Sequence, residues 1–168
     1  MNDRRQRPVL EIPLTIIEKN LEVISILVLI APLLYIIAIW ADLPETVPMH
    51  FRFDGTPDGW GSKYSIFLLI GVECIVYVGL TVLARFPHIY SYPWPITAEN
   101  AQRQYTLART LIRWIKLEVV MIFGYVLWGV VVSAKEQTIA LSGVALALML
   151  ATTAVTVIVY MVQAGKGQ

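Results

Sequence analysis

Charged residues are scarce in this sequence, and the charges that are present nearly cancel. Asp, Glu, Lys and Arg make up 15% of the 168 residues, against about 25% in an average soluble domain. Thirteen Lys and Arg oppose twelve Asp and Glu, which gives a net charge of +1. Proteins that bind nucleic acid through bulk charge carry a clear basic excess. We therefore expect no nucleic-acid partner.

Cysteine is nearly absent, since Cys74 is the only one. A single cysteine excludes an internal disulfide and a cysteine-rich zinc site. The sequence also lacks the Walker, Rossmann and HExxH patterns that bind phosphate, dinucleotide and zinc. We predict no cofactor, and we favour a protein that is not an enzyme.

Hydrophobic residues, by contrast, make up 57% of the chain and gather in long runs. A helix needs about 20 apolar residues to cross a bilayer. A water-soluble bundle would carry charge at helical spacing on its outer faces, but these runs are apolar all round. The sequence predicts an all-α membrane protein, one membrane domain over 1–168, whose four transmembrane helices contact the lipid bilayer at 23–41, 64–85, 111–134 and 138–163.

Lysine and arginine are distributed unevenly between the connections. Ten lie in the N-terminal segment 1–22, in the loop and helix extension 86–110 with its adjoining helix ends, and in the C-terminal tail, whereas three lie on the other side. Cytoplasmic flanks are enriched in these residues. We predict a multi-pass protein of the cytoplasmic (plasma) membrane with both termini in the cytoplasm and the loop 42–63 outside. No Ala-x-Ala site follows the first run, so we expect no cleavable signal peptide.

The cytoplasmic connections contain further helix signals. Residues 8–20 have apolar positions near helical spacing, which predicts either a helix along the inner membrane surface or a frayed tail. Thr97 is a candidate N-cap, with Glu99 in the first turn of a helix that reaches Ala134. This third helix should therefore extend several turns into the cytoplasm.

A stripe of small residues lies four apart in the last predicted helix, at Gly143, Ala147 and Ala151. Small residues let another helix backbone approach closely. We predict that this face packs against a helix, either within the chain or in a protein partner or second copy.

The outer loop, LPETVPMHFRFDGTPDGWGSK over 43–63, is rich in special residues. Apolar positions alternate with other residues in the pattern of a short strand with one apolar face: Val47, Met49, Phe51 and Phe53. The dipeptides Asp54-Gly55 and Asp58-Gly59 predict turns. We expect a compact cap that rests on the helix ends.

The end of this loop carries a cation at a helix start. Ser62 is a candidate N-cap for the second helix, but the helix dipole disfavours Lys63 there. We therefore predict an acidic partner for Lys63, either Asp54 or Asp58.

Two interpretations of the polar residues in the loop remain open. His50, Asp54 and Asp58 are residue types that bind Zn²⁺ or Mn²⁺. Alternatively, the two carboxylates cap turns and His50 bonds a backbone carbonyl, or the residues contact a ligand directly.

Two acidic residues lie within the predicted membrane helices. Glu73 should lie roughly 13 Å below the outer surface, where an unpaired carboxylate is costly. Burial favours its neutral form, and the hydroxyl of Tyr77 or Tyr125 could bond it. Its role is either structural or in ligand or proton handling. Glu118 should lie near the inner surface, with snorkelling partners among Arg85, Arg113 and Lys116.

The loop residues resemble the signature of a known family. The matching positions are Leu43-Pro44, Pro48, His50-Phe51, Gly55, Asp58-Gly59-Trp60 and Ser62-Lys63. A second, cytoplasmic stretch also matches, at Thr97, Glu99-Asn100 and Tyr105. Over about residues 40–130, the chain resembles the SdpI-like immunity and signalling membrane proteins of bacteria and archaea. This resemblance implies a small polytopic membrane protein involved in immunity or signalling.

Three functions are consistent with these features. The first is a non-enzymatic SdpI-like protein whose outer loop senses or neutralises an extracellular peptide or other ligand. The second is a structural accessory subunit of a larger membrane complex. The third is a metal-dependent membrane enzyme that uses the polar residues of the loop.

Overall fold

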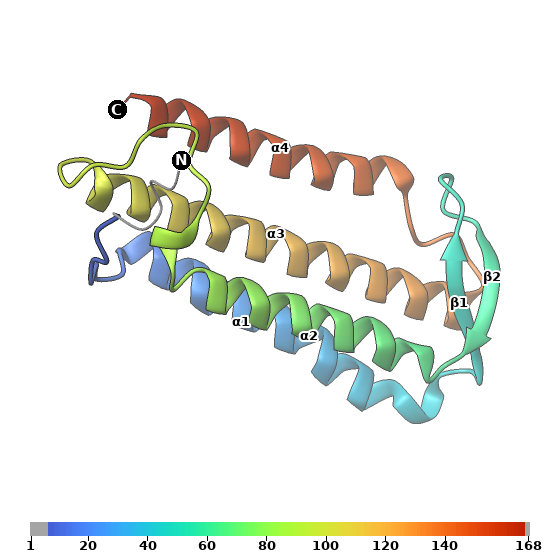
Figure 1. Ribbon diagram of the computed structural model, residues 1–168. Coiled ribbons are helices and arrows are strands. Elements are labelled where there is room, and N and C mark those ends of the chain that lie inside the picture. The colour runs from blue at the N-terminus through green and yellow to red at the C-terminus, as the bar shows by residue number, and fades with distance from the viewer. Residues whose placement is uncertain (1–6, 167–168) are drawn as a thin grey trace.

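The computed structural model describes residues 7–166, which form four long helices with a two-stranded hairpin at one end (Figure 1). The elements in chain order are α1 (Ile16–Ile39), the short helix η2 (Trp40–Asp42), β1 (Thr46–Phe51), β2 (Pro57–Ser62), α2 (Ser65–Leu83), η3 (Pro87–Ile89), α3 (Ala101–Glu136) and α4 (Gly143–Gly165). The hairpin lies at one end of the bundle and the chain ends at the other. Arg4 and Arg5, which contribute to the predicted orientation, lie outside the described residues.

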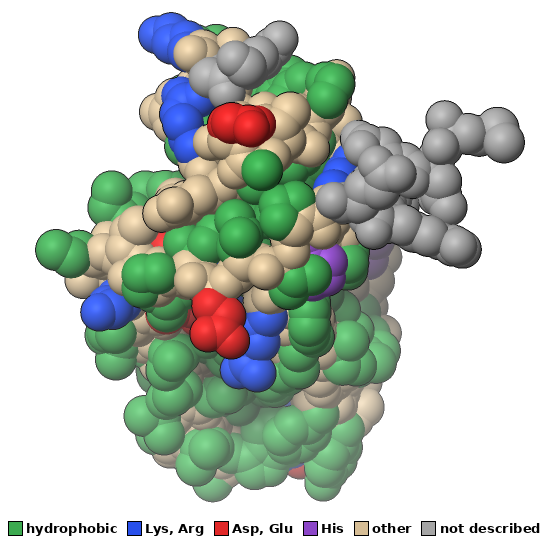
Figure 2. Space-filling view, turned by 60° about the vertical axis from the view of Figure 1, so that its left-hand side comes forward, with side chains coloured by type: hydrophobic (Ala, Val, Ile, Leu, Met, Phe, Trp, Pro, Cys, Tyr) green, Lys and Arg blue, Asp and Glu red, His purple; other side chains and the backbone are tan. Residues whose placement is uncertain are grey.

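All four helices are long and apolar enough to cross a membrane. Their outer faces expose many large apolar side chains, as expected where a protein contacts lipid. Figure 2 shows that charged side chains gather at the end with the chain termini, whereas hydrophobic side chains cover the flank behind them. The prediction of a helical, multi-pass membrane protein is confirmed, with the small sheet as an addition.

Helix α3 is the central helix of the bundle. In its most apolar stretch 44% of the residues are buried, against 11% in α1, 11% in α2 and none in α4. Each of the other three long helices packs against α3, and so does β1. Because α3 runs the full length of the bundle (Figure 1), it connects the hairpin to the opposite end.

Helix α1 begins at Ile16, earlier than the predicted span. Its first turn is a capping box: Thr15 Oγ1 accepts from the Glu18 N–H at 3.2 Å, and Glu18 Oε2 accepts from the Thr15 N–H at 2.8 Å. Residues 8–15 form neither a surface helix nor a free tail. Pro8 and Pro13 oppose a helix there. Side chains of α3 donate hydrogen bonds to the carbonyl groups of this segment and hold it in place.

Both predicted N-caps are displaced by a few residues. A turn precedes α3, in which Thr97 Oγ1 accepts from the Asn100 N–H at 3.4 Å and Asn100 Oδ1 accepts from the Thr97 N–H at 2.9 Å. The N-cap residue of α3 is therefore Asn100. Helix α2 has Tyr64 at its N-cap position, without a side-chain cap. Ser62 ends β2 instead, because strand pairing reaches that far.

Candidate functional site

The hairpin turns at Asp54 and Gly55, as predicted. Asp54 Oδ1 accepts from the N–H and the hydroxyl of Thr56 at 2.9 and 2.6 Å, and these bonds hold the pKa of the Asp54 carboxyl below its usual value. Gly55 has φ of +86°, a conformation that favours glycine. The prediction of a turn at Asp58-Gly59 is wrong, because both residues lie within β2, where Gly59 pairs with His50.

The hairpin register changes which side chains face the bundle. The pairing shifts at His50, so that Met49 has no partner on β2. Such a bulge turns later side chains away from the face set by earlier ones. Val47 and Pro48 are buried, but Met49 and Phe53 are 51% and 75% exposed. The predicted single apolar face is therefore wrong at Met49 and Phe53, whereas Phe51 packs against the same buried cluster as Val47.

The tip of the hairpin is locked onto the start of α4. A Cβ atom at Gly55 would collide with the carbonyl oxygen of Leu141, and one at Gly143 would collide with that of Phe53. Two glycines thus permit a close approach of backbones on both sides of this contact. The loop is therefore packed against the start of α4 and is not a flexible connection.

A polar cluster occupies the exposed side of the hairpin. Asp58 Oδ1 lies 2.5 Å from His50 Nδ1, and Arg52 Nε donates to Asp58 Oδ2 at 3.4 Å. The hydrogen bond with His50 lowers the pKa of the Asp58 carboxyl, because it stabilises the ionised form. The side chains of His50 and Arg52 are 72% and 68% exposed. The predicted bond from His50 to a backbone carbonyl is replaced by this contact with Asp58.

The three candidate metal ligands do not converge. Asp54 bonds Thr56 within the turn, whereas Asp58 bonds His50. Within residues 7–166, no three His, Cys, Asp or Glu side chains are grouped in a way that could hold a metal ion. The interpretation as a metal site therefore lacks a third ligand.

Large apolar side chains are also exposed on the hairpin and just after it. Met49, Phe53, Trp60 and Tyr64 have exposed fractions of 51, 75, 54 and 62%. We refer to the exposed side chains of this region as the hairpin surface: Met49, His50, Arg52, Phe53, Asp58 and Trp60. It combines apolar, cationic and anionic groups, and the turn of the hairpin that carries it is packed closely against the start of α4.

Lys63 has an acidic partner, but not a predicted one. Lys63 Nζ lies 3.0 Å from Glu45 Oε1 and 5.2 Å from the centre of the Trp40 ring. Antiparallel pairing places residue 45 opposite residue 63, and their backbones are hydrogen-bonded. The choice of Asp54 or Asp58 was wrong because both carboxylates are used within the hairpin.

Glu73 lies in the middle of α2 and is 1% exposed. Its Oε1 atom has no hydrogen-bond partner among the described residues. The predicted partners are wrong: the Tyr125 hydroxyl accepts from the Ser142 N–H at 3.0 Å, and the Tyr77 ring lies 4.7 Å from Lys116 Nζ. An unpaired carboxyl group at this depth is costly, so Glu73 stays a candidate for function.

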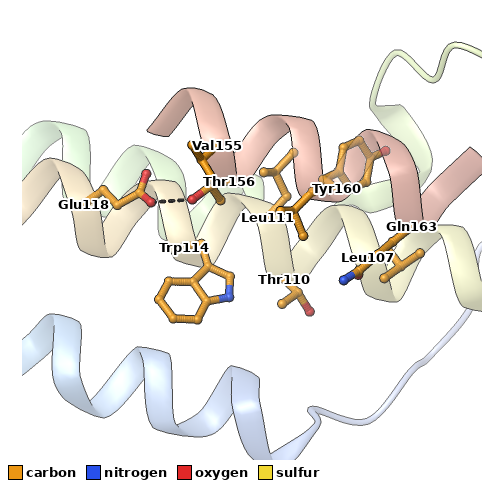
Figure 3. Close-up of a pocket in the computed structure, with 10 residues that line it drawn as sticks. Leu107, Thr110, Leu111, Trp114, Glu118, Val155, Thr156, Tyr160 and Gln163 are labelled. Carbon is orange, nitrogen blue, oxygen red and sulfur yellow. Dashed lines mark hydrogen bonds between the residues drawn. The ribbon is translucent and has the colours of Figure 1, made fainter. Parts of the chain in front are cut away.

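Glu118 lines a groove between α3 and α4. Thr156 Oγ1 donates to Glu118 Oε1 at 2.5 Å, while Oε2 is buried without a partner in the described chain. Arg85, Arg113 and Lys116, its expected partners, form no ion pair with it. Figure 3 shows Glu118 and Trp114 projecting from α3. The groove measures about 310 Å³ and is otherwise lined by Leu107, Thr110, Leu111, Val155, Val159, Tyr160 and Gln163.

A buried ion-pair network lies at the end of the bundle opposite the hairpin. Arg109 donates to both carboxylate oxygens of Glu18 at 2.9 Å, and Arg113 Nη1 donates to Glu18 Oε1 at 3.1 Å. Glu22 contacts Arg113 Nε at 3.0 Å and Lys116 Nζ at 2.5 Å. The Glu22 side chain is 23% exposed, and the other four are at most 7% exposed. These contacts fasten α1 to α3.

From the sequence, these cations served to orient the chain, and Arg113 and Lys116 were taken as possible partners of Glu118, but the network was missed. Residues 109, 113 and 116 share one helix face, and residues 18 and 22 share another. Charges on a membrane helix turn toward a partner, because an isolated charge in lipid is costly. Two matching stripes of opposite sign were therefore the signal that could have revealed the pairing.

The second motif stretch lies at the same end as the network. The Tyr105 hydroxyl donates to the Pro8 carbonyl at 3.1 Å, and Tyr105 is fully buried. Thr97 and Asn100 form the turn before α3, and a hydrogen bond with Thr97 lowers the pKa of Glu99. The two stretches of the sequence motif therefore occupy opposite ends of the bundle rather than a single site.

Only one position of the small-residue stripe of α4 makes a close contact within the described chain. Gly143 packs against the hairpin, whereas Ala147 and Ala151 are exposed. Ala147 also lines a cavity of about 400 Å³ between α4 and the hairpin. The rest of the stripe faces outward from the bundle.

Comparison with known proteins relates this architecture to one archaeal relative. An uncharacterised protein of Archaeoglobus fulgidus is 34% identical over 83 residues, which are 48% of this chain and 45% of the relative. The chain thus spans about half the length of the curated relative that it matches. No solved structure matches the chain.

One family model matches part of the chain. The matched segment contains the second half of α1, the whole hairpin and α2 as far as Glu73, so it includes the hairpin surface and one intramembrane acid. Residues 27–73 of this protein are similar to the family described as "Domain of unknown function (DUF1648)".

Proposed function

We propose that this protein is a non-enzymatic membrane protein that senses or neutralises an extracellular peptide or other ligand through its hairpin, in immunity or signalling. The observation that carries the proposal is the hairpin surface. It exposes Met49, Phe53 and Trp60 beside the His50, Arg52 and Asp58 cluster, on a backbone fixed against α4. Exposed apolar groups on a rigid support are typical of interaction sites.

The chemistry of this surface favours an amphipathic peptide at the membrane boundary. Apolar side chains of such a peptide would contact Met49, Phe53 or Trp60. Its polar groups would bond the His50 ring or the Arg52 guanidinium, both of which are mostly exposed. Helix α3 contacts β1 at one end and carries the ion-pair network at the other, which supports a route for signalling across the membrane.

The proposal requires the hairpin to face outward. The uneven distribution of Lys and Arg supports this orientation. In a Cys74→Ser background, Thr56→Cys should react with an impermeant thiol reagent in whole cells, whereas Gln102→Cys should react only after lysis. The reverse pattern of labelling would exclude recognition outside the cell.

Photo-crosslinking tests the recognition itself. A photoreactive amino acid at position 60, introduced into cells that express the protein naturally, should form an adduct with a peptide. The same group at Val155, on α4, should yield lipid adducts only. His50→Ala should leave the fold intact, because the ring is 72% exposed, but should reduce the peptide adduct and any protection from the peptide. Lipid adducts alone at position 60 would contradict the proposal.

An accessory subunit of a larger membrane complex is the second candidate, and the exposure of α4 favours it. None of its most apolar stretch is buried, and Ala147 and Ala151 offer a close helix approach. Ala147→Leu with Ala151→Leu should then release a protein that co-purifies from native membranes, or dissociate a homo-oligomer. Recognition by the hairpin predicts no such release.

A further inference from the structure

A cavity lined by basic and apolar residues lies at the end of the bundle opposite the hairpin and has no part in the proposed function. It measures about 440 Å³ and is lined by the segment before α1, the end of α2 with η3, and α3. Its lining includes Arg85, Arg109, Arg113 and His88. Glu11, which is exposed, is the acid of this lining.

The buried network beside this cavity has an excess of positive charge. Arg109, Arg113 and Lys116 face two acids, Glu18 and Glu22, so one cation lacks a counter-charge. Burial of an uncompensated charge is strongly unfavourable. An anion that entered the cavity would balance the network.

The two arginines of the network, Arg109 and Arg113, differ in their free donors. Arg109 is occupied, because it donates to Glu18 and to the carbonyl groups of Ile12 and Pro13. Arg113 contacts its partners through Nε and Nη1, which leaves Nη2 without a partner in the described chain.

Arg85 adds a second group of donors to the cavity. It follows the last turn of α2 and is exposed, and its side chain has no ion-pair partner in residues 7–166. Arg85 and Arg113 therefore bring two sets of unpaired donors to the lining of the same cavity.

We propose that this cavity binds the phosphate group of an anionic phospholipid. Arginine suits phosphate oxygens because its donors are planar and its charge is permanent. The cavity lies where α2 leaves its apolar stretch, at the level expected for lipid headgroups. Apolar side chains make up much of the remaining lining, which favours a lipid over a free phosphate ion: Val9, Leu10, Ile12, Leu14, Phe86 and Pro87.

Native mass spectrometry of the protein purified in a non-ionic detergent tests this site. The probes are phosphatidylglycerol, phosphatidylcholine with the same acyl chains, and glycerol 3-phosphate, which has the anionic group without the chains. Phosphatidylglycerol should remain bound where the other two do not. Arg85→Gln should weaken its binding about tenfold, the effect of one charge-assisted hydrogen bond.

Lys135→Gln is the matched control, since it removes one exposed cation at the hairpin end and should leave lipid binding unchanged. Equal binding of phosphatidylcholine, or equal loss in Arg85→Gln and Lys135→Gln, would overturn the site. Binding of glycerol 3-phosphate as strong as that of the lipid would replace it with a free-anion site.

Discussion

The two ends of this bundle use similar charged residues in opposite environments. At the hairpin end, His50, Arg52 and Asp58 pair on the surface, with the basic side chains about 70% exposed. At the other end, Glu18 and Arg109 pair where neither side chain is more than 7% exposed. Exposed pairs contribute little to stability, whereas breaking a buried pair is costly. The buried end therefore contributes more to the stability of the fold than the hairpin end, whose basic side chains remain accessible to solvent.

The largest effect should come from the buried acid. Glu18→Ala leaves Arg109 and Arg113 without their shared carboxylate and also removes the capping-box partner of Thr15. We expect a loss of about 3–5 kcal/mol in the free energy of unfolding, measured by denaturation with sodium dodecyl sulfate in mixed micelles.

Asp58→Ala is the comparison for this variant, because it removes the shared carboxylate of the hairpin cluster. The midpoint of denaturation should remain that of the parent protein. If the two variants lost equal stability, the contrast between the ends would be wrong.

Glu73 tests the same principle within the membrane. Its Oε1 atom is unpaired, so Glu73→Leu should raise the free energy of unfolding by about 1–3 kcal/mol. Glu73→Lys should lower it by about 2.5–3.5 kcal/mol and reduce accumulation in the membrane. Glu73→Gln, which keeps the shape and remains polar, is the control. A loss of stability in Glu73→Leu would indicate a partner or ligand for the carboxyl group.

The four helices could be predicted from the sequence because length and apolarity decide whether a segment suits lipid. The partners of the polar residues could not. Lys63 pairs with Glu45 because of a strand register, and Met49 faces outward because of a bulge. Both depend on tertiary pairing, which a local alternation of residues does not specify.

The acids on the helices show the same limit. Their depth in the membrane could be estimated from the helix rise. Which residue of the facing helix lies next to each acid could not be predicted in this way. Glu118 therefore accepts a hydrogen bond from Thr156 rather than pairing with an expected cation. The ion pairs of Glu18 with Arg109 and Arg113 were not predicted at all.

A smaller effect is expected at the edge of the hairpin. Lys63→Ala removes the pair with Glu45, whose side chain is 79% exposed, and the contact with the Trp40 ring. We expect a loss of about 1 kcal/mol and faster cleavage of the hairpin in limited proteolysis. Glu45→Gln should have less effect, because the contact with the ring remains. Equal cleavage of Lys63→Ala and the parent would show that the cap is held by its backbone contacts alone.

The smallest effect is a pH dependence at the hairpin surface. The pKa of Asp58 is lowered from its ordinary value of 3.8 in the folded hairpin, first by the bond with His50. The ionised carboxyl group therefore stabilises the hairpin above that value, and this contribution is lost as the pH falls through the lowered pKa. Hydrogen exchange, corrected for its intrinsic pH dependence, should show hairpin amides protected at pH 5 and less protected below about pH 4.

Asp54 also has a lowered pKa, so Asp58→Asn should reduce this pH dependence and leave the part due to Asp54. The amides of α3 in the same sample provide the reference, because the Asp58 and Asp54 bonds do not involve that helix. If Asp58→Asn left the full pH dependence in place, the His50, Arg52 and Asp58 cluster would not order the hairpin surface, and recognition would depend on its apolar side chains.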